Sequence, residues 1–162
     1  MKSTGEVMGI DNDFGLAYAK SQISSGNSLP TKGLAFISLK DKHKNEGVDL
    51  AKKLVELNFT LCGTEGTANA IKKNGIECKK INKVSGGSPH IVDILNAKKI
   101  ALVINTGGGK RAYRVIDSTS LRRATLINKV PYCTNMSTAY TCLEGIKSLK
   151  TKKINVKAIQ EF

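Results

Sequence analysis

What this chain of 162 residues lacks already narrows the classes of protein to which it can belong. It has no tryptophan, and aromatic residues make up only 5% of it, so a stacking platform for single-stranded nucleic acid is not favoured. Its longest apolar runs, such as Leu34 to Ile37, fall far short of the roughly 20 residues that cross a bilayer. The opening "MKSTGEVMGIDND" carries acids and no apolar stretch of the kind found in secretory signals, so we expect a cytoplasmic location.

Patterns typical of metal sites and disulfide frameworks are also missing. The four cysteines form no C-x-x-C pair, and the chain has only two histidines, His43 and His90. We therefore expect no metal site, and we expect reduced cysteines that pack as small apolar residues.

Positive charge is what the chain has in excess. Its 26 lysines and arginines outnumber 13 acids, which gives a formal net charge of +13 and favours an anionic partner. Arginine, the residue that most often reads base edges, occurs at only four positions, so a nucleic-acid-binding module is a weaker alternative to phosphorylated small molecules. A surface of solvated lysines would also account for much of this charge.

Short apolar strands alternate with amphipathic helices over most of the chain. Strands are expected at 34–39, 59–62, 76–81, 100–105 and 131–135, and helices at 46–58, 67–75, 89–99, 120–129 and 137–149. This alternation predicts an α/β fold in which helices cover both faces of a parallel sheet. The very apolar strand 100–105 is expected at the centre of the sheet.

Different patterns precede and follow the alternating region. A short helix is expected near the start, with Phe14, Ala17, Tyr18 and Ile23 near one face, and a Ser- and Gly-rich linker follows it at 24–33. The residues from Thr151 onward are rich in lysine. We therefore expect a leading segment at 1–32, an α/β domain at 33–150 and a C-terminal tail at 151–162.

Polar and cationic residues follow the expected strands, at the carboxyl ends where parallel sheets bind ligands. Lysines follow the first strand, two threonines and glycines the second, and "NTGGGKR" the fourth. The candidate anion-binding residues are Lys44, Thr64, Thr67, Lys83, Asn105, Thr106 and Lys110. Taken singly, such a threonine is often only a helix cap and such a lysine is often only solvated. Their coincidence at one edge favours a phosphate site.

The loop "NTGGGKR" at 105–111 is not a nucleotide-hydrolysing P-loop. Ile104 stands where that motif needs its first glycine, and Arg111 where it needs Ser or Thr. No G-x-G-x-x-G follows a strand either. ATP hydrolysis and dinucleotide redox chemistry are therefore both poorly supported.

Longer motifs resemble one known family. "MKSTGEVMGID" resembles the end of the second ATP-grasp half of the carbamoyl-phosphate synthetase large chain. "KGLAFISLKDKHKNEGVDLAKKLVELNFTLCGTEGTANAIKKNGI", "INKVSGGSPHIVDIL", "LVINTGGGKR", "LRRATLINKVPY" and "STAYTCLEGI" resemble its C-terminal regulatory domain, in the same order. This domain type is shared with methylglyoxal synthase and with the inosinate cyclohydrolase domain of purine synthesis.

The resemblance implies a three-layer, Rossmann-like sandwich with a five-stranded parallel sheet, as in methylglyoxal synthase. It also implies a domain without catalysis that binds nucleotide effectors, UMP or IMP in bacterial members, whereas animal relatives use N-acetylglutamate. Residues 1–32 would then be the end of the ATP-grasp domain plus a linker. ATP and Mg²⁺ would belong to the catalytic domains. The partners would be the rest of the large chain, the small glutaminase chain and further copies in oligomer contacts.

The family's effector motif carries over onto the candidate residues. Lys44 and Lys83 match its lysines, Thr64 and Thr67 match its T-x-G-T turn, and Asn105 and Thr106 begin its N-T-x-x-G loop. Lys110 stands where some bacterial members have arginine, and Gly107 replaces a common hydroxyl residue. Cys133 replaces the acid of members that respond to ornithine, so the resemblance implies no ion pair for ornithine here.

A methylglyoxal-synthase-type lyase is the enzymatic alternative. That enzyme needs an aspartate in a G-G-D turn and a later histidine. Ser88 occupies the aspartate position after two glycines, and no histidine follows His90. A serine cannot serve as the carboxylate base, so we expect no catalytic residue in this chain.

Overall fold

The computed structural model describes residues 6–107 and 112–161. Within these ranges lie the five strands β1 (Gly33–Ser38), β2 (Phe59–Gly63), β3 (Lys79–Lys80), β4 (Ile100–Asn105) and β5 (Tyr132–Cys133). The α-helices are α1 (Phe14–Ser24), α2 (Lys44–Glu56), α3 (Glu65–Lys72), α4 (Ile91–Asn96), α5 (Ala112–Ile127) and α6 (Met136–Thr151). Short 3₁₀ helices span Asp41–His43, Val84–Gly86 and Ile159–Glu161.

The strands form one parallel sheet in the order β3-β2-β1-β4-β5, which confirms the predicted five-stranded architecture. The prediction that 100–105 is central was wrong, because β1 is the middle strand and β4 lies beside it. Both strands pair on two sides and are covered on two faces. Their apolar composition therefore shows that both are interior strands, but it does not show which of them is the middle one. The edge strands β3 and β5 pair over only two residues each, far less than the predicted 76–81 and 131–135.

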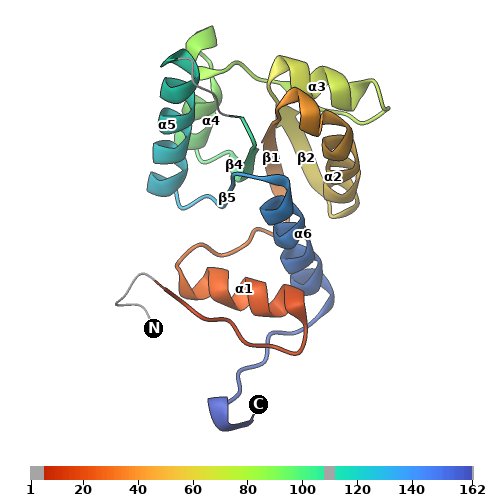
Figure 1. The fold of residues 1–162 in the computed structure, drawn as a ribbon, viewed down its shortest axis with the longest axis vertical. Helices are drawn as coiled ribbons and strands as arrows, with labels where there is room; N and C mark the ends of the chain where they lie inside the picture. The colour runs from red at the N-terminus through yellow and green to blue at the C-terminus, as the bar shows by residue number, and fades with distance from the viewer. Residues whose placement is uncertain (1–5, 108–111, 162) are drawn as a thin grey trace.

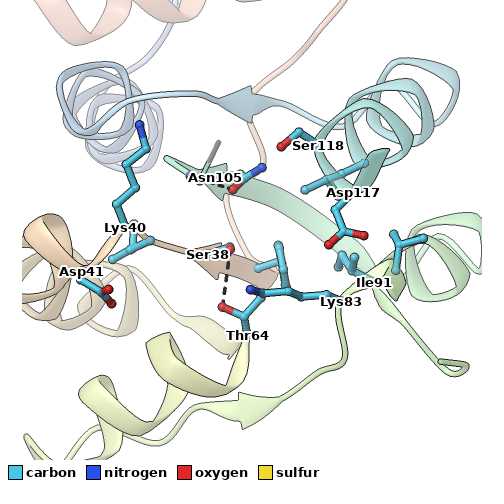
Figure 2. A pocket seen from close by; sticks show the side chains of 14 residues that line it. Ser38, Lys40, Asp41, Thr64, Lys83, Ile91, Asn105, Asp117 and Ser118 are labelled. Atoms are coloured by element: carbon cyan, nitrogen blue, oxygen red, sulfur yellow. Dashed lines mark hydrogen bonds between the residues drawn. The ribbon is translucent and has the colours of Figure 1, made fainter. Parts of the chain in front are cut away.

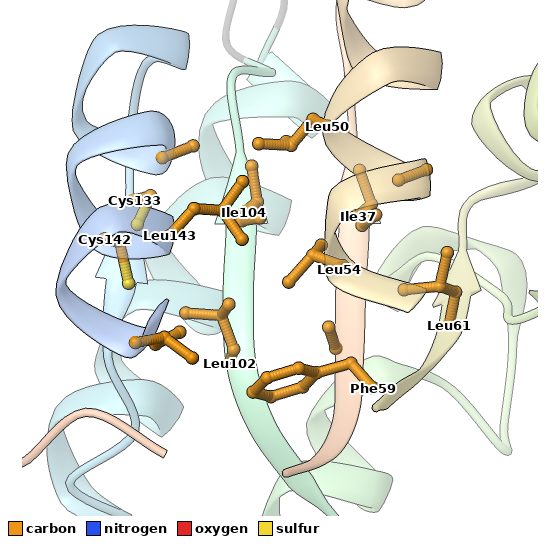
Figure 3. Packing of buried hydrophobic residues seen from close by; sticks show 14 of the residues in the cluster. Ile37, Leu50, Leu54, Phe59, Leu61, Leu102, Ile104, Cys133, Cys142 and Leu143 are labelled. Atoms are coloured by element: carbon orange, nitrogen blue, oxygen red, sulfur yellow. The ribbon is translucent and has the colours of Figure 1, made fainter. Parts of the chain in front are cut away.

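Helices cover both faces of the sheet, as predicted (Figure 1). On one face, Ile37 and Ile104 pack with Leu50 and Leu54 of α2 and with Leu143 of α6 (Figure 3). On the other face, alternate strand residues such as Phe36 and Val103 pack with residues of α4 and α5. The alternation of side chains along each strand therefore builds two separate cores from one sheet.

The leading helix α1 packs on α6 and lies at the opposite end of the molecule from α3, α4 and α5 (Figure 1). Two glycines make this contact close. A Cβ on Gly15 would lie 2.5 Å from the Glu144 carbonyl oxygen, and one on Gly145 would lie 3.1 Å from Tyr18 Cδ1. The predicted apolar face was only partly right: Tyr18 packs against the core, whereas Phe14 is 66% exposed and Ile23 is 44% exposed. A helix that meets its neighbour through small residues does not need a broad apolar stripe.

An ion pair adds to the packing at the start of α1. The Lys152 ammonium lies 2.5 Å from the Asp13 carboxylate. Hydrogen bonds from Lys152 and Ser148 hold the pKa of Asp13 well below its usual range. The leading segment and the beginning of the tail are thus both tied to the α1–α6 pair, while the predicted division at 32 and 150 stays a prediction.

All four cysteines are free and buried, as predicted. Burial raises the pKa of Cys62 to about 12 and that of Cys78 to about 11, so neither thiol is readily ionised. Among the described residues, no helix is long and apolar enough to cross a membrane, and no cluster of His, Cys, Asp and Glu has the arrangement of a metal site.

The core on the α2 face gives a direct test of the packing. Leu54 is fully buried there, so Leu54→Ala should lower the free energy of unfolding by about 2–5 kcal/mol through lost burial and a cavity. Leu126→Ala is the matched control, because Leu126 is 70% exposed and its truncation should cost about 0.5 kcal/mol or less. Urea denaturation of the two variants measures the difference, and equal losses would contradict this packing.

Candidate functional site

The register of the sheet brings three strand ends together at one edge. Ser38 at the end of β1 pairs with Asn105 at the end of β4, and Ile37 pairs with Gly63 at the end of β2. The loops that follow β1, β2 and β4 therefore open on the same side of the molecule. This is the edge at which the sequence predicts a phosphate site.

Two adjoining cavities occupy this edge. The first has a volume of about 330 Å³ and the second about 500 Å³. They share Leu39, Asp41, Thr64 and Lys83 in their walls, and this pair of cavities is called the recess. Figure 2 shows the first cavity, with Ser38 and Thr64 at the strand ends and Asp117 and Ser118 facing them from α5.

Most of the predicted residues meet in this recess. Lys44, Thr64, Thr67 and Lys83 line the second cavity, and Asn105 joins Thr64 and Lys83 around the first. Thr106 lies at the same edge but lines neither cavity. Lys110 lies outside the described residues.

The amino end of α3 faces the second cavity. Thr64 is its N-cap residue, yet the Thr64 side chain makes no capping hydrogen bond. Its hydroxyl lies instead 3.3 Å from the Thr67 hydroxyl, which accepts the Leu39 N–H at 3.0 Å. Glu65, Gly66 and Thr67 of the first turn line the cavity, so the helix presents its partly positive end to whatever enters.

Lys44, the first residue of α2, reaches across to the same helix end. Its Nζ lies 3.3 Å from the point where a Cβ on Gly66 would stand, so the missing side chain leaves room for the ammonium. The Lys44 side chain is 29% exposed, and its Nζ lies 2.6 Å from the Asp41 carboxylate. An ammonium above a helix N-terminus is a strong arrangement for binding an oxyanion.

Asn105 and Thr106 shape the walls of the recess through internal hydrogen bonds. The Asn105 side-chain oxygen accepts the Gly107 N–H, and its nitrogen donates to the Tyr132 hydroxyl, both at 3.0 Å. The Thr106 hydroxyl accepts the Lys40 N–H at 3.2 Å and lies 3.0 Å from His43 Nδ1. Thr106 therefore fixes the loop after β4 against the loop after β1, whereas Asn105 holds its own loop and contacts β5.

Sequence reasoning missed Asp117 and Ser118, which line the first cavity. The helix containing them was predicted to begin at residue 120, whereas α5 begins at Ala112. The prediction therefore placed these two residues in a loop and did not indicate which way their side chains point. If the helix had been predicted to begin earlier, Asp117 and Ser118 would have been recognised as a polar pair one turn before the buried Leu121.

The position where a lyase needs its base contains no suitable carboxylate. The Ser88 hydroxyl donates to Asp93 at 2.9 Å, and the His90 N–H donates to the same oxygen at 2.8 Å. These bonds form a helix cap and hold the pKa of Asp93 below its usual range. A carboxylate stabilised in this way is a poor proton acceptor, which argues against enolisation chemistry here.

The fold and the recess together define an α/β domain whose strand ends open on a recess lined by lysines and hydroxyl side chains. Comparison with protein families matches residues 46–134 to the MGS-like domain, and the chain belongs to this family. A solved methylglyoxal synthase from Elizabethkingia anophelis has the same fold, with a TM-score of 0.53 and 19% identity. That match covers 71% of this chain and 79% of the synthase.

Curated relatives extend the match to the whole chain. The carbamoyl phosphate synthase large chain of Mesorhizobium japonicum is 45% identical over 162 residues, which is 100% of this chain and 14% of the relative. The C-terminal sections of the large chain from Methanopyrus kandleri and Aquifex aeolicus are 45% and 46% identical, with 30% and 31% of their lengths covered. The chain therefore spans less than a third of each of these relatives, and its resemblance to their C-terminal section is confirmed.

The role of Thr106 in holding two loops together can be measured. Thr106→Val removes the acceptor of the Lys40 N–H and the contact with His43, so it should lower the free energy of unfolding by about 1–3 kcal/mol. Thr60→Val at an exposed position of β2 is the control and should change it by about 0.5 kcal/mol or less. Guanidinium denaturation compares them, and a Thr106→Val variant as stable as the control would refute the role.

Proposed function

We propose that this chain is the C-terminal regulatory section of a carbamoyl phosphate synthase large chain and that its recess binds a nucleoside monophosphate. The observation that carries the proposal is the Lys44 ammonium placed above the α3 N-terminus, beside a cavity lined by Thr64 and Lys83. The match of the entire chain to C-terminal sections of that enzyme supports the wider context. The chain itself would catalyse nothing.

The second cavity suits the phosphate group. Its oxygens would accept hydrogen bonds from Lys44, from the first-turn amides of α3 and from the Thr64 hydroxyl. Lys83, which lines both cavities, would add charge at the rim. The matching lysine at 110 would contribute from the neighbouring loop, as the family resemblance implies.

The first cavity suits the nucleoside. Phe36, Val84, Ile91 and Leu121 give it apolar walls that fit a base. The Asp117 carboxylate can accept hydrogen bonds from sugar hydroxyls, and Asn105 and Thr106 fix the loop beside it. UMP and IMP are the leading candidates, and N-acetylglutamate is a weaker one because it has no phosphate.

Regulation would reach catalytic domains that lie outside this chain. The leading segment packs through α1 on α6, which places it to transmit a signal to the rest of the large chain and through it to the small glutaminase chain. Effectors of this type shift equilibria by about 1–3 kcal/mol, so the ligand would bias activity without switching it absolutely. ATP and Mg²⁺ would act in those other domains, and copies of this domain would also contribute to oligomer contacts.

Thermal-shift and calorimetric titrations with UMP, IMP and N-acetylglutamate test the site. Binding of a nucleotide should raise the melting temperature of the wild-type chain. Lys44→Ala should weaken binding about 10- to 100-fold, the loss expected for a charge-assisted hydrogen bond of about 1.5–3 kcal/mol. Lys52→Ala, an exposed lysine near the other end of the same helix, is the matched control and should bind as wild type does.

The Asp117→Ala variant distinguishes the contribution of the sugar contact from that of the phosphate contacts. It should weaken UMP or IMP binding about tenfold, in line with a charged hydrogen bond, and leave the affinity for inorganic phosphate unchanged.

Equal nucleotide binding by the Lys44→Ala and Lys52→Ala variants would refute the site. Turnover of dihydroxyacetone phosphate would favour the lyase, and salt-dependent retention on DNA would favour a polyanion-binding role.

A further inference from the structure

The loop after β1 places a carboxylate on the lysine that the proposed function assigns to phosphate. Asp41 begins the 3₁₀ helix Asp41–His43 and lies three residues before Lys44. Its carboxylate is 2.6 Å from Lys44 Nζ, although the Asp41 side chain is 94% exposed. Asp41 also lines both cavities of the recess.

A second carboxylate repeats this arrangement elsewhere around the second cavity. Glu65, the first residue of α3, lies 2.5 Å from the Lys80 ammonium. Both residues line the second cavity. Of the three lysines that line that cavity in the described part of the chain, Lys44 and Lys80 are thus each paired with an acid. The recess is much less positive than its lysines alone would suggest.

We propose that Asp41 is an internal competitor that occupies Lys44 when no effector is bound and that an incoming phosphate must displace it. This inference rests on the proposed function, because it concerns the same lysine and the same cavity. Exposed ion pairs between neighbouring residues contribute little to stability, so the Asp41–Lys44 pair opens easily. The tethered carboxylate still lowers the affinity for every anion that needs the same ammonium.

The position of Asp41 also links displacement to the conformation of the loop. The His43 N–H donates to the Lys40 carbonyl at 2.9 Å, and His43 Nδ1 lies 3.0 Å from the Thr106 hydroxyl. Release of the Asp41 carboxylate would remove one of two contacts between the start of this short helix and Lys44, because the Lys44 N–H also donates to the Asp41 carbonyl. Occupancy of the cavity would thereby act on the turn between β1 and α2.

Calorimetry with UMP and with inorganic phosphate, at fixed pH and ionic strength, tests this competition. Asp41→Asn should bind both ligands about two- to fivefold more tightly than wild type, the size expected when one exposed ion pair no longer competes. Glu56→Gln is the matched control, because it makes the same change in net charge at the far end of α2. Its affinities should equal those of the wild type.

The gain should depend on the lysine. In a Lys44→Ala background, Asp41→Asn should improve binding no more than Glu56→Gln does. Tighter binding that persists without Lys44 would reduce Asp41 to a general repulsive charge and overturn the proposal. Weaker or unchanged binding by Asp41→Asn alone would overturn it too, because Asp41 would then orient Lys44 or leave it unaffected.

The same titrations separate this inference from the proposed function. If wild type binds UMP and loses it in Lys44→Ala, while Asp41→Asn matches Glu56→Gln, only the competition fails. If neither UMP nor inorganic phosphate binds to wild type or to Asp41→Asn, the site and the competition fail together.

Discussion

The register of β1 against its two neighbours is the constraint on which the rest of this structure depends. Parallel pairing fixes β2 and β4 on either side of β1, and it brings Ser38, Gly63 and Asn105 to one edge. Because helices bury both faces of these strands, the ends of the sheet are where polar groups can reach solvent and ligands. The position of the recess that we propose as a phosphate site follows from this geometry, because the register gathers the loops after β1, β2 and β4 at one edge.

The recess divides its polar residues between two tasks. Thr67, Asn105 and Thr106 are almost fully buried, and their hydrogen bonds hold loops together. Lys44 is partly exposed and Lys83 is exposed, so an exchange of ion-pair partners costs these two lysines little free energy. Fixed walls with partly exposed charges fit the reversible ligand binding that we propose for this recess.

Contacts run without a break from the recess to the leading helix. The helix α2, which begins at Lys44, is linked to α6 by the Tyr140 hydroxyl, which donates to the Glu46 carbonyl at 3.1 Å and to Asp49 at 3.0 Å. The helix α6 in turn packs on α1 through Gly145 and Gly15. Such a chain of contacts makes communication physically feasible, and transmission further requires an element with two states.

The sequence by itself determined the α/β class, the approximate positions of the strands and the edge at which cations and hydroxyls gather, because each depends on local periodicity and on the residue types just after each strand. Only the tertiary structure decided that β1 is central and that α1 buries its small residues. It alone placed Asp117 in the cavity and Asp41 on Lys44. Periodicity reports that a residue is buried or exposed, whereas its partners are set by contacts between segments distant in the chain.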